Sequence, residues 1–321
     1  MRLISHILKG IGFVVIVSTL SFSMQMGMDD PSGAVEKGPN TTGNEERRVS
    51  ETYQISSIDI PEDLNFSGEI VPQDDPEIME RIDREFLVNT YWQSNAILLL
   101  KRAHKYFPII EPILAEHNIP DDFKYLAVAE SGLQNVVSSA GATGFWQFMK
   151  TTAREYGMEV NENVDERYHL EKSTEAACKY LQRSYKKYGS WTLAAAAYNT
   201  GPGSLDRYRS TQDESDYYNL LLSEETGRYV FRILALKEIL SDSEKYGFIV
   251  DEEDHYPAVP DYAITVDSPI TNLANFAKSH EINYKILKRH NPWLRQAHLN
   301  NASRKVYQIA IPHKGHYTTI P

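Results

Sequence analysis

The chain is poor in cysteine, with Cys178 the only one among 321 residues. An intrachain disulfide and a cysteine-based metal site are therefore excluded. Cys178 lies among alanines in a helical pattern, which predicts a buried structural thiol. The 10 histidines form neither a His-x-x-x-His nor a His-Glu-x-x-His motif. We therefore expect no metal site, no metal-dependent chemistry and no cofactor.

Basic residues are also scarce. The sequence has 33 Lys and Arg against 44 Asp and Glu, which gives a formal net charge of -11. A protein that binds nucleic acid needs a basic face for the phosphates, so this balance argues against nucleic acid as a partner. It argues equally against simple electrostatic adhesion to an anionic wall or membrane. A polymer substrate would have to be held by shape, stacking and hydrogen bonds.

The chain has no apolar run of the roughly 20 residues that a comfortable membrane span needs. Its N-terminus has Arg2 and Lys9, then an apolar run over residues 11–20 and small residues over 21–23. That order is typical of a signal peptide. We expect residues 1–23 to be a signal peptide or an N-terminal membrane anchor, and the protein to be exported to the periplasm or cell envelope. No cysteine stands directly after the run, so a lipoprotein signal is excluded.

Residues 24–76 are rich in Ser, Gly, Pro, Asp, Glu and Asn and carry few large apolar side chains. Such a composition cannot bury enough surface to offset the entropy lost on ordering. We predict a flexible tether that is more ordered at its end, where four apolar side chains can dock on the folded domain. These side chains are Ile58, Ile60, Leu64 and Phe66.

Helical periodicity dominates residues 77–248, in which Pro108 and Pro112 are expected to punctuate one segment. The acidic, proline-containing stretch 249–261 is predicted to be a linker. In residues 262–315 a strand, two helices and a closing strand follow one another, which predicts a small βααβ module. The expected fold class is therefore mainly α, a helical domain followed by this module.

Glu130 is the first candidate for chemistry. It ends the apolar helical segment 125–129 and is followed by Ser131 and Gly132. A carboxyl group at the end of an apolar helix, facing a cleft, would have its pKa raised by desolvation, which suits a general acid. A glutamate in this position is more often a solvated helix-end residue. The pattern around Glu130 alone leaves both interpretations open.

Further features follow Glu130 along the chain. In order, they are a small-residue loop (139–144), an aromatic run with one amide (145–149), an alanine-rich helix ending in Tyr198-Asn199 (194–199), and a Glu-Thr-x-x-Tyr-Val segment (225–230). Each alone is explained as a core aromatic, a helix cap or a turn. Together they resemble the catalytic domain of lytic transglycosylases of the soluble lytic transglycosylase (SLT) type. That family has Glu-Ser, a Gly-Leu-Met-Gln-like loop, Ala-Tyr-Asn and Glu-Thr-x-x-Tyr-Val in this order.

The resemblance covers residues 100–240 and is strongest to the membrane-bound murein transglycosylase D branch. Phe145-Trp146 stands where the family has Leu-Met, a bulkier wall that could alter subsite shape. The resemblance implies a lysozyme-like helical fold and peptidoglycan glycan strands as the substrate. Glu130 would protonate the bond between N-acetylmuramic acid and N-acetylglucosamine. It would then act as base while the muramyl 6-hydroxyl attacks C1, which leaves a 1,6-anhydromuramyl end.

Other roles are implied by position in the resemblance. Tyr198 would hydrogen-bond near Glu130 or the sugar and orient the acid. Ser139 and Gln147 would contact the sugar beside the scissile bond. Met149 would give the cleft an apolar wall, and Asn199 would tie loops together.

Residues 262–315 resemble a LysM domain, a small βααβ unit that binds N-acetylglucosamine chains. The match is degenerate, because the glycine of the family's opening Val-x-x-Gly-Asp-Thr-Leu is missing after the segment 262–266. The module either binds glycan or is a structural remnant packed on the catalytic domain.

Two other functions remain open. A goose-type lysozyme-like hydrolase would use Glu130 with water as nucleophile, and it is favoured if Glu225 or Asp206 lies across the cleft at about 6.5–9.5 Å. Glu225 either lines the cleft or is a helix N-terminal acid stabilised by the helix dipole. A catalytically silent wall-binding protein is the second alternative, and the presence of Glu130, Gln147 and Tyr198 argues against it.

Overall fold

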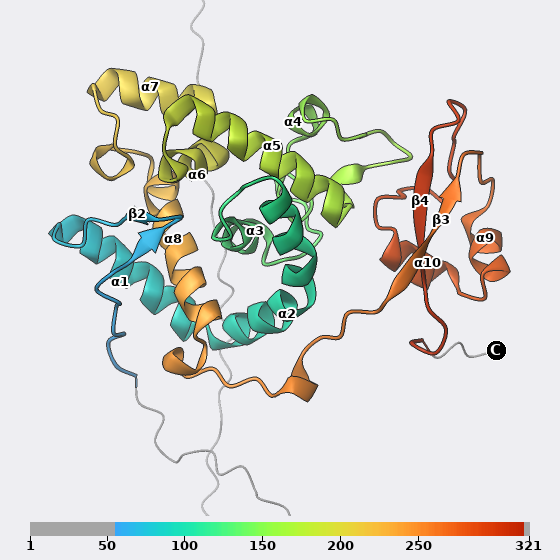
Figure 1. Ribbon diagram of the computed structural model, residues 1–321, viewed down its shortest axis with the longest axis horizontal. Helices are drawn as coiled ribbons and strands as arrows, with labels where there is room; N and C mark the ends of the chain where they lie inside the picture. The colour runs from blue at the N-terminus through green and yellow to red at the C-terminus, as the bar shows by residue number, and fades with distance from the viewer. Residues whose placement is uncertain (1–54, 318–321) are drawn as a thin grey trace, which may run out of the picture. The chain divides into compact units, whose positions relative to one another are not determined.

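The structure is a computed structural model that describes residues 55–317 (Figure 1). The expected signal peptide or anchor, and residues 24–54 of the expected tether, lie outside the described residues. Within 55–317, no helix is long and apolar enough to cross a membrane.

Helices build most of the described chain before residue 250. They are α1 (Pro76–Tyr91), α2 (Gln93–Glu116), α3 (Phe123–Ser131), α4 (Lys150–Glu155), α5 (Leu170–Tyr188), α6 (Trp191–Thr200), α7 (Pro202–Gln212) and α8 (Glu224–Ser241). Their ends follow local chemistry. The Asp75 side chain accepts hydrogen bonds from the first turn of α1, and Gly189 ends α5 in the left-handed conformation. The predicted mainly α fold class is confirmed.

Helix α2 corrects one expectation, because it continues through Pro108 and Pro112 without ending. A proline inside a helix removes one hydrogen bond and displaces a carbonyl of the preceding turn. Both prolines are exposed, so water can hydrogen-bond to the backbone carbonyls that lose their helical partners. Ile110 and Leu114, on the opposite face of the helix, are buried in the core. Tertiary packing therefore holds the helix together where local propensity would break it.

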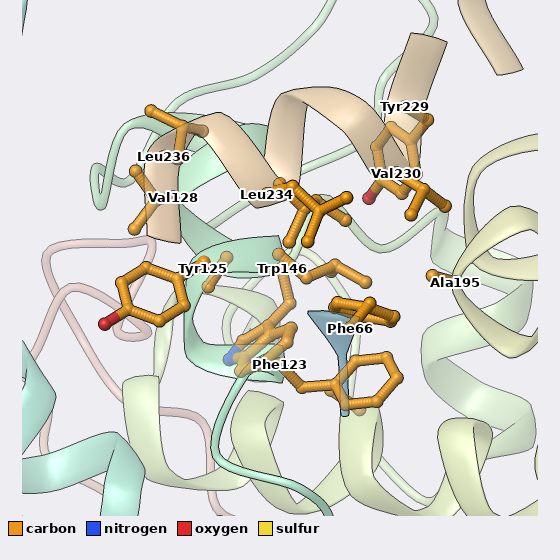
Figure 2. Packing of buried hydrophobic residues seen from close by; sticks show 14 of the residues in the cluster. Phe66, Phe123, Tyr125, Val128, Trp146, Ala195, Tyr229, Val230, Leu234 and Leu236 are labelled. Atoms are coloured by element: carbon orange, nitrogen blue, oxygen red, sulfur yellow. The ribbon is translucent and has the colours of Figure 1, made fainter. Parts of the chain in front are cut away.

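The core of the helical domain forms around α8, which packs against α1, α3 and α6. Figure 2 shows Phe66, Phe123 and Trp146 packed beneath Val230 and Leu234 of α8. The rings of Phe66 and Phe123 meet edge to face, 5.1 Å between centroids. Trp146 is fully buried, and its indole N–H donates a hydrogen bond to the Thr174 hydroxyl at 2.9 Å. The aromatic run is thus mainly core.

The end of the expected tether packs on the helical domain. It forms a hairpin of β1 (Asn65–Phe66) and β2 (Glu69–Ile70), and it buries Leu64 and Phe66 in the core. The Glu69 carboxylate accepts hydrogen bonds at the start of α6 from the Ser190 and Thr192 side chains and from the Trp191 and Thr192 backbone N–H groups.

Phe66→Ala is expected to destabilise the protein by about 3–5 kcal/mol, because it deletes a fully buried ring and leaves a cavity. Ile70→Ala in the same hairpin is the control, since the Ile70 side chain is 82% exposed. Urea unfolding of both variants measures the difference. Equal, small losses would show that the hairpin does not contribute to the core.

The C-terminal module consists of β3 (Asp261–Val266), α9 (Leu273–Ser279), α10 (Tyr284–His290) and β4 (Tyr307–Pro312). The two strands are antiparallel, with Asp261 opposite Pro312 and Val266 opposite Tyr307. The predicted βααβ order is confirmed. The module has its own small core, centred on Leu273, Leu287, Trp293 and Ile309.

A segment of the helical domain, residues 159–167, is joined to this module. Val164 belongs to the module's core and bridges to Leu294, and the backbone N–H of Asp165 donates to the Trp293 carbonyl at 2.9 Å. The Tyr307 hydroxyl donates to the Glu159 carboxylate at 2.9 Å. The module and this segment therefore pack against each other through shared apolar and hydrogen-bonded contacts.

Candidate active site

Glu130 lies one residue before the end of α3. The helix buries its apolar residues from Phe123 to Val128 and stops at Gly132, which has φ 58° and caps the last turn with its N–H. Because the helix ends against the core, the Glu130 side chain is only partly exposed. The sequence pattern of an apolar run followed by Ser-Gly thus positions a carboxyl group at the edge of the core.

The electrostatic environment raises the pKa of Glu130 to about 7. Burial is the main cause, and the negative charge of Glu225 adds to it. A hydrogen bond from the Tyr229 hydroxyl to Oε1, and the positive charge of Arg232, act in the opposite direction. Both protonation states are therefore populated at neutral pH, as a group that gives and then takes a proton requires.

Glu130 opens into a cavity of about 440 Å³. Glu85 also lines this cavity, but its carboxylate is fully buried and accepts charge-assisted contacts from Arg84, Arg228 and Arg232 at 2.7, 2.7 and 3.5 Å. Three guanidinium groups thus engage the Glu85 carboxylate in ion pairs, so it is not free to contact a substrate. Glu130 is thus the one carboxyl group among the described lining residues that is poised for proton transfer.

Tyr198 is placed at the end of α6, with its ring edge to face against Phe148, 5.9 Å between centroids. Its hydroxyl donates to the Trp146 carbonyl at 2.6 Å. Burial and the nearby charge of Glu130 raise the pKa of this phenol well above its ordinary value. The described hydrogen bond to Glu130 comes from Tyr229, a residue to which sequence reasoning gave no role although it stands in the Glu-Thr-x-x-Tyr motif.

A second cavity, of about 390 Å³, brings together four of the sequence-predicted residues: Gln147, Met149, Tyr198 and Asn199. Gln147 adopts φ 47°, and its amide donates to the carbonyls of Gly144 and Val136 at 2.7 and 3.2 Å. Val136 lines the Glu130 cavity, so the Gln147 side chain is hydrogen-bonded to the backbone of a residue in that cavity's wall.

Asn199 and Met149 also line this second cavity. The Asn199 side-chain oxygen accepts a hydrogen bond from the Thr226 hydroxyl at 2.8 Å, which ties α6 to α8. Met149 is 43% exposed at the start of α4 and can contact a ligand.

Ser139 and Glu225 lie in neither of these two cavities. Ser139 is exposed in the loop before Gly144, and Glu225 is exposed in the first turn of α8. Asp206 is engaged at the surface by Lys187 and by the Tyr188 hydroxyl, the latter at 3.0 Å. Glu225 affects Glu130 through its charge.

The loop that precedes Gln147 requires a glycine at position 144. It has φ +86°, and a Cβ there would lie 2.0 Å from the Arg167 carbonyl oxygen. Arg167 in turn donates to the carbonyls of Gly141 and Phe148 at 3.0 and 3.1 Å. Arg167 and Gly144 thus fix the loop that carries Gln147.

Gly144→Ala is expected to destabilise the protein by about 3 kcal/mol and to lower activity, because the loop must move off the Arg167 backbone. Gly141→Ala is a matched control: Gly141 has the same φ of +86° but no heavy atom within 4 Å of the added Cβ. It should lose only about 1 kcal/mol, the cost of the left-handed backbone. Urea unfolding and digestion assays measure both variants, and equal losses would contradict the role of the close approach.

One group of described residues could hold a metal ion. Ligand atoms of His104, Glu252 and His255 lie within 4.8 Å of one another, and His104 and Glu252 are exposed. None of the three lines the Glu130 cavity. His104 and His255 are far apart in the sequence, so no spacing motif could have indicated the cluster.

Comparison with known proteins agrees with these features. Residues 107–221 match the family described as the transglycosylase SLT domain, and residues 262–315 match the soluble lytic transglycosylase C-terminal LysM-like domain. The chain therefore carries an SLT domain followed by a LysM-like domain, as the sequence resemblance predicted. The matched SLT region includes Glu130, whereas Glu225 and Tyr229 lie just beyond it.

Individual relatives carry related names. The chain is 32% identical over 219 residues to membrane-bound lytic murein transglycosylase D of Escherichia coli strain K12, covering 66% of this chain and 47% of that protein. The chain thus spans about half the length of the curated relatives it matches.

Among solved structures, the 70 kDa soluble lytic transglycosylase of Escherichia coli aligns at 21% identity and a TM-score of 0.37, over 48% of this chain and 27% of that chain. An inactive mutant of lytic transglycosylase Slt from Pseudomonas aeruginosa aligns at 20% identity and a TM-score of 0.34, over 48% and 26%.

Proposed function

We propose that the protein is a peptidoglycan lytic transglycosylase that cleaves the β-1,4 bond between N-acetylmuramic acid and N-acetylglucosamine. The observation that carries the proposal is the state of Glu130, a partly buried carboxyl with a pKa of about 7 at the wall of a cavity. The SLT domain match, and the similarity to a protein named lytic murein transglycosylase, support the substrate class.

In the first step the protonated Glu130 donates its proton to the glycosidic oxygen as the bond from C1 to that oxygen breaks. The N-acetylglucosamine side leaves as a free 4-hydroxyl. The acetamido group of the muramyl sugar stabilises the positive charge that develops at C1. Tyr229 holds one oxygen of Glu130 by hydrogen bonding, which leaves the other oxygen for the substrate.

In the second step the Glu130 carboxylate takes the proton from the muramyl 6-hydroxyl while that oxygen bonds to C1. The product is a 1,6-anhydromuramyl end, and no water is consumed. An intramolecular nucleophile removes the need for a second carboxylate, which ordinary glycosidases require. The ion pairing of Glu85 and the surface engagement of Asp206 support this single-acid mechanism.

We further propose that the protein works in the cell envelope after export, attached to the membrane if the N-terminal segment is retained. The hydrolase alternative uses the same glutamate with water, and the wall-binding alternative uses no chemistry. These functions leave different products, which makes them separable in one assay.

The test is digestion of purified peptidoglycan by the full chain and by its Glu130→Gln variant, with products resolved by mass. We expect anhydromuramyl products, lighter by one water than the hydrolytic ones, from the wild type and none from the variant. Hydrolytic reducing ends would establish the lysozyme-like alternative instead. Intact strands with both proteins would contradict the proposed chemistry and leave the wall-binding alternative.

A further inference from the structure

A third cavity, of about 700 Å³, lies beside the candidate active site. It is bounded by α2, by the linker around Pro257 and by α10. Gln134 and Val136 line both this cavity and the one that holds Glu130. A strand bound at Glu130 would therefore have its neighbouring groups within reach of this cavity.

The charge of this cavity is opposite to that of the protein. Arg102, Lys105 and Arg289 line it, and no Asp or Glu is among its described lining residues, although the chain has a net charge of -11. Burial and the positive charge of Arg289 lower the pKa of Lys105. Like charges gathered without a counter-charge favour an anionic ligand, which would relieve their repulsion.

An adjoining cavity of about 300 Å³ shares Lys105 and Arg289 and does include acidic residues. Those acids are already paired. Glu171 contacts His169 Nδ1 at 3.0 Å, and Asp261 contacts His290 Nδ1 at 2.9 Å. Among the described contacts, both carboxylates are thus held by histidines and not by Lys105 or Arg289.

The shape and lining favour an extended organic anion. Tyr106, Phe145 and Tyr256 supply aromatic walls, and Gln134 and Asn135 supply side-chain amides. Arg102 donates to the carbonyl of Gly132 at 3.0 Å, so its guanidinium is held beside the end of the helix that carries Glu130. Carboxylates on a flexible chain would find both charge and amide partners here.

We propose that this cavity binds the carboxylates carried by the muramyl sugars of a peptidoglycan strand while Glu130 acts on the neighbouring bond. The inference rests on the proposed function and adds a substrate preference to it. Two sources supply such carboxylates: the peptides attached to the lactyl group, and the lactyl group itself where the peptide has been removed. In both cases the protein binds the strand through the carboxylates of its side groups as well as through its sugars.

The test measures binding with the full chain in a Glu130→Gln background, so that strands are not cut. Soluble strands are offered in three forms: with peptides, with the peptide carboxylates converted to amides, and stripped of peptides. Lys105→Gln with Arg289→Gln should weaken binding of peptide-bearing strands about tenfold, the effect of losing charge-assisted hydrogen bonds. Amidated strands should bind both proteins equally and more weakly.

The control is Lys278→Gln with Lys285→Gln, which removes the same charge from exposed positions of the C-terminal module that do not line the cavity. This control should leave affinity unchanged. A similar weakening in the control would show only a general charge effect and overturn the proposal, as would unchanged binding of amidated strands by the wild type. An effect retained on stripped strands would support the proposal and assign the lactyl carboxylate as the ligand.

Failure of this inference is distinguishable from failure of the proposed function. If the wild type cleaves strands normally and all variants bind all strands with equal affinity, the proposed role of the cavity is overturned and the proposed function stands. If binding depends on charge but the wild type cleaves no strands, the proposed role of the cavity is supported and the proposed chemistry is overturned.

Discussion

Glu130→Gln is expected to lower the rate of strand cleavage about a thousandfold while the protein stays folded. The amide keeps the shape and a hydrogen bond with Tyr229 but can neither give nor take the proton. Initial rates on soluble strands measure the loss. Glu116→Gln, the same change at the exposed end of α2, is the control and should leave the rate unchanged.

The same substitution should stabilise the protein at alkaline pH. In the folded state Glu130 keeps its proton up to about pH 7, whereas the ordinary pKa is 4.5. Deprotonation therefore costs the folded state about 3 kcal/mol above pH 7, and this cost disappears as the pH falls below 4.5. Urea unfolding at pH 8 should show the variant to be more stable than the wild type, and the difference should vanish near pH 4.

An inactive variant that is also less stable at pH 8 would contradict this account, since it would indicate lost packing instead of a lost proton carrier. Activity retained by the variant would contradict the catalytic role altogether. A gain in stability together with a loss of activity is the pattern expected of a group buried for function.

Tyr229→Phe is expected to move the alkaline limb of the pH–rate profile to higher pH and to lower the maximal rate about tenfold or more. The hydroxyl lowers the pKa of Glu130 by hydrogen bonding, so its removal raises that pKa, and the first step needs the protonated acid. The rate falls because an unanchored carboxyl is no longer oriented.

Glu225→Gln should shift the same limb in the opposite direction. The negative charge of Glu225 raises the pKa of Glu130, so its removal lowers that pKa and the rate begins to fall at lower pH. Glu224→Gln, one residue earlier and exposed, serves as control and should move the limb little. Shifts of the same sign in the Tyr229 and Glu225 variants would refute the electrostatic description of the site. A complete loss of activity in Glu225→Gln would favour the hydrolase with a second essential carboxylate.

The features that the sequence predicted are those with local causes. The apolar run before Glu130, followed by Ser-Gly, predicted a carboxyl group at the end of a helix, and Glu130 is the penultimate residue of α3. The alternation of residues 262–266 and 306–312 predicted the two strands of the βααβ module, which pair as β3 and β4. Such features depend on side-chain period and on turn chemistry, both of which a single sequence displays.

The features that the sequence could not predict depend on contacts between distant segments. Tyr229 reaches Glu130 across 99 positions, and periodicity does not say which side chain of α8 faces α3. In the sequence Glu85 resembles an ordinary surface acid of α1. In the structure, arginines from α8 form ion pairs with it. Pro108 failed as a helix breaker for the same reason, because the neighbours that hold α2 are non-local.

The joint between residues 159–167 and the C-terminal module has a consequence for how such proteins are cut and recombined. Val164 is buried among the module's residues, and Arg167, two positions beyond Asp165, holds the loop that carries Gln147. Deleting the module would expose Val164 and free Asp165 from Trp293, which would loosen that loop from a distance. The C-terminal module therefore cannot be exchanged without affecting the helical domain. Gene fusions that exchange it at the linker would have to bring along a matching partner for the 159–167 segment.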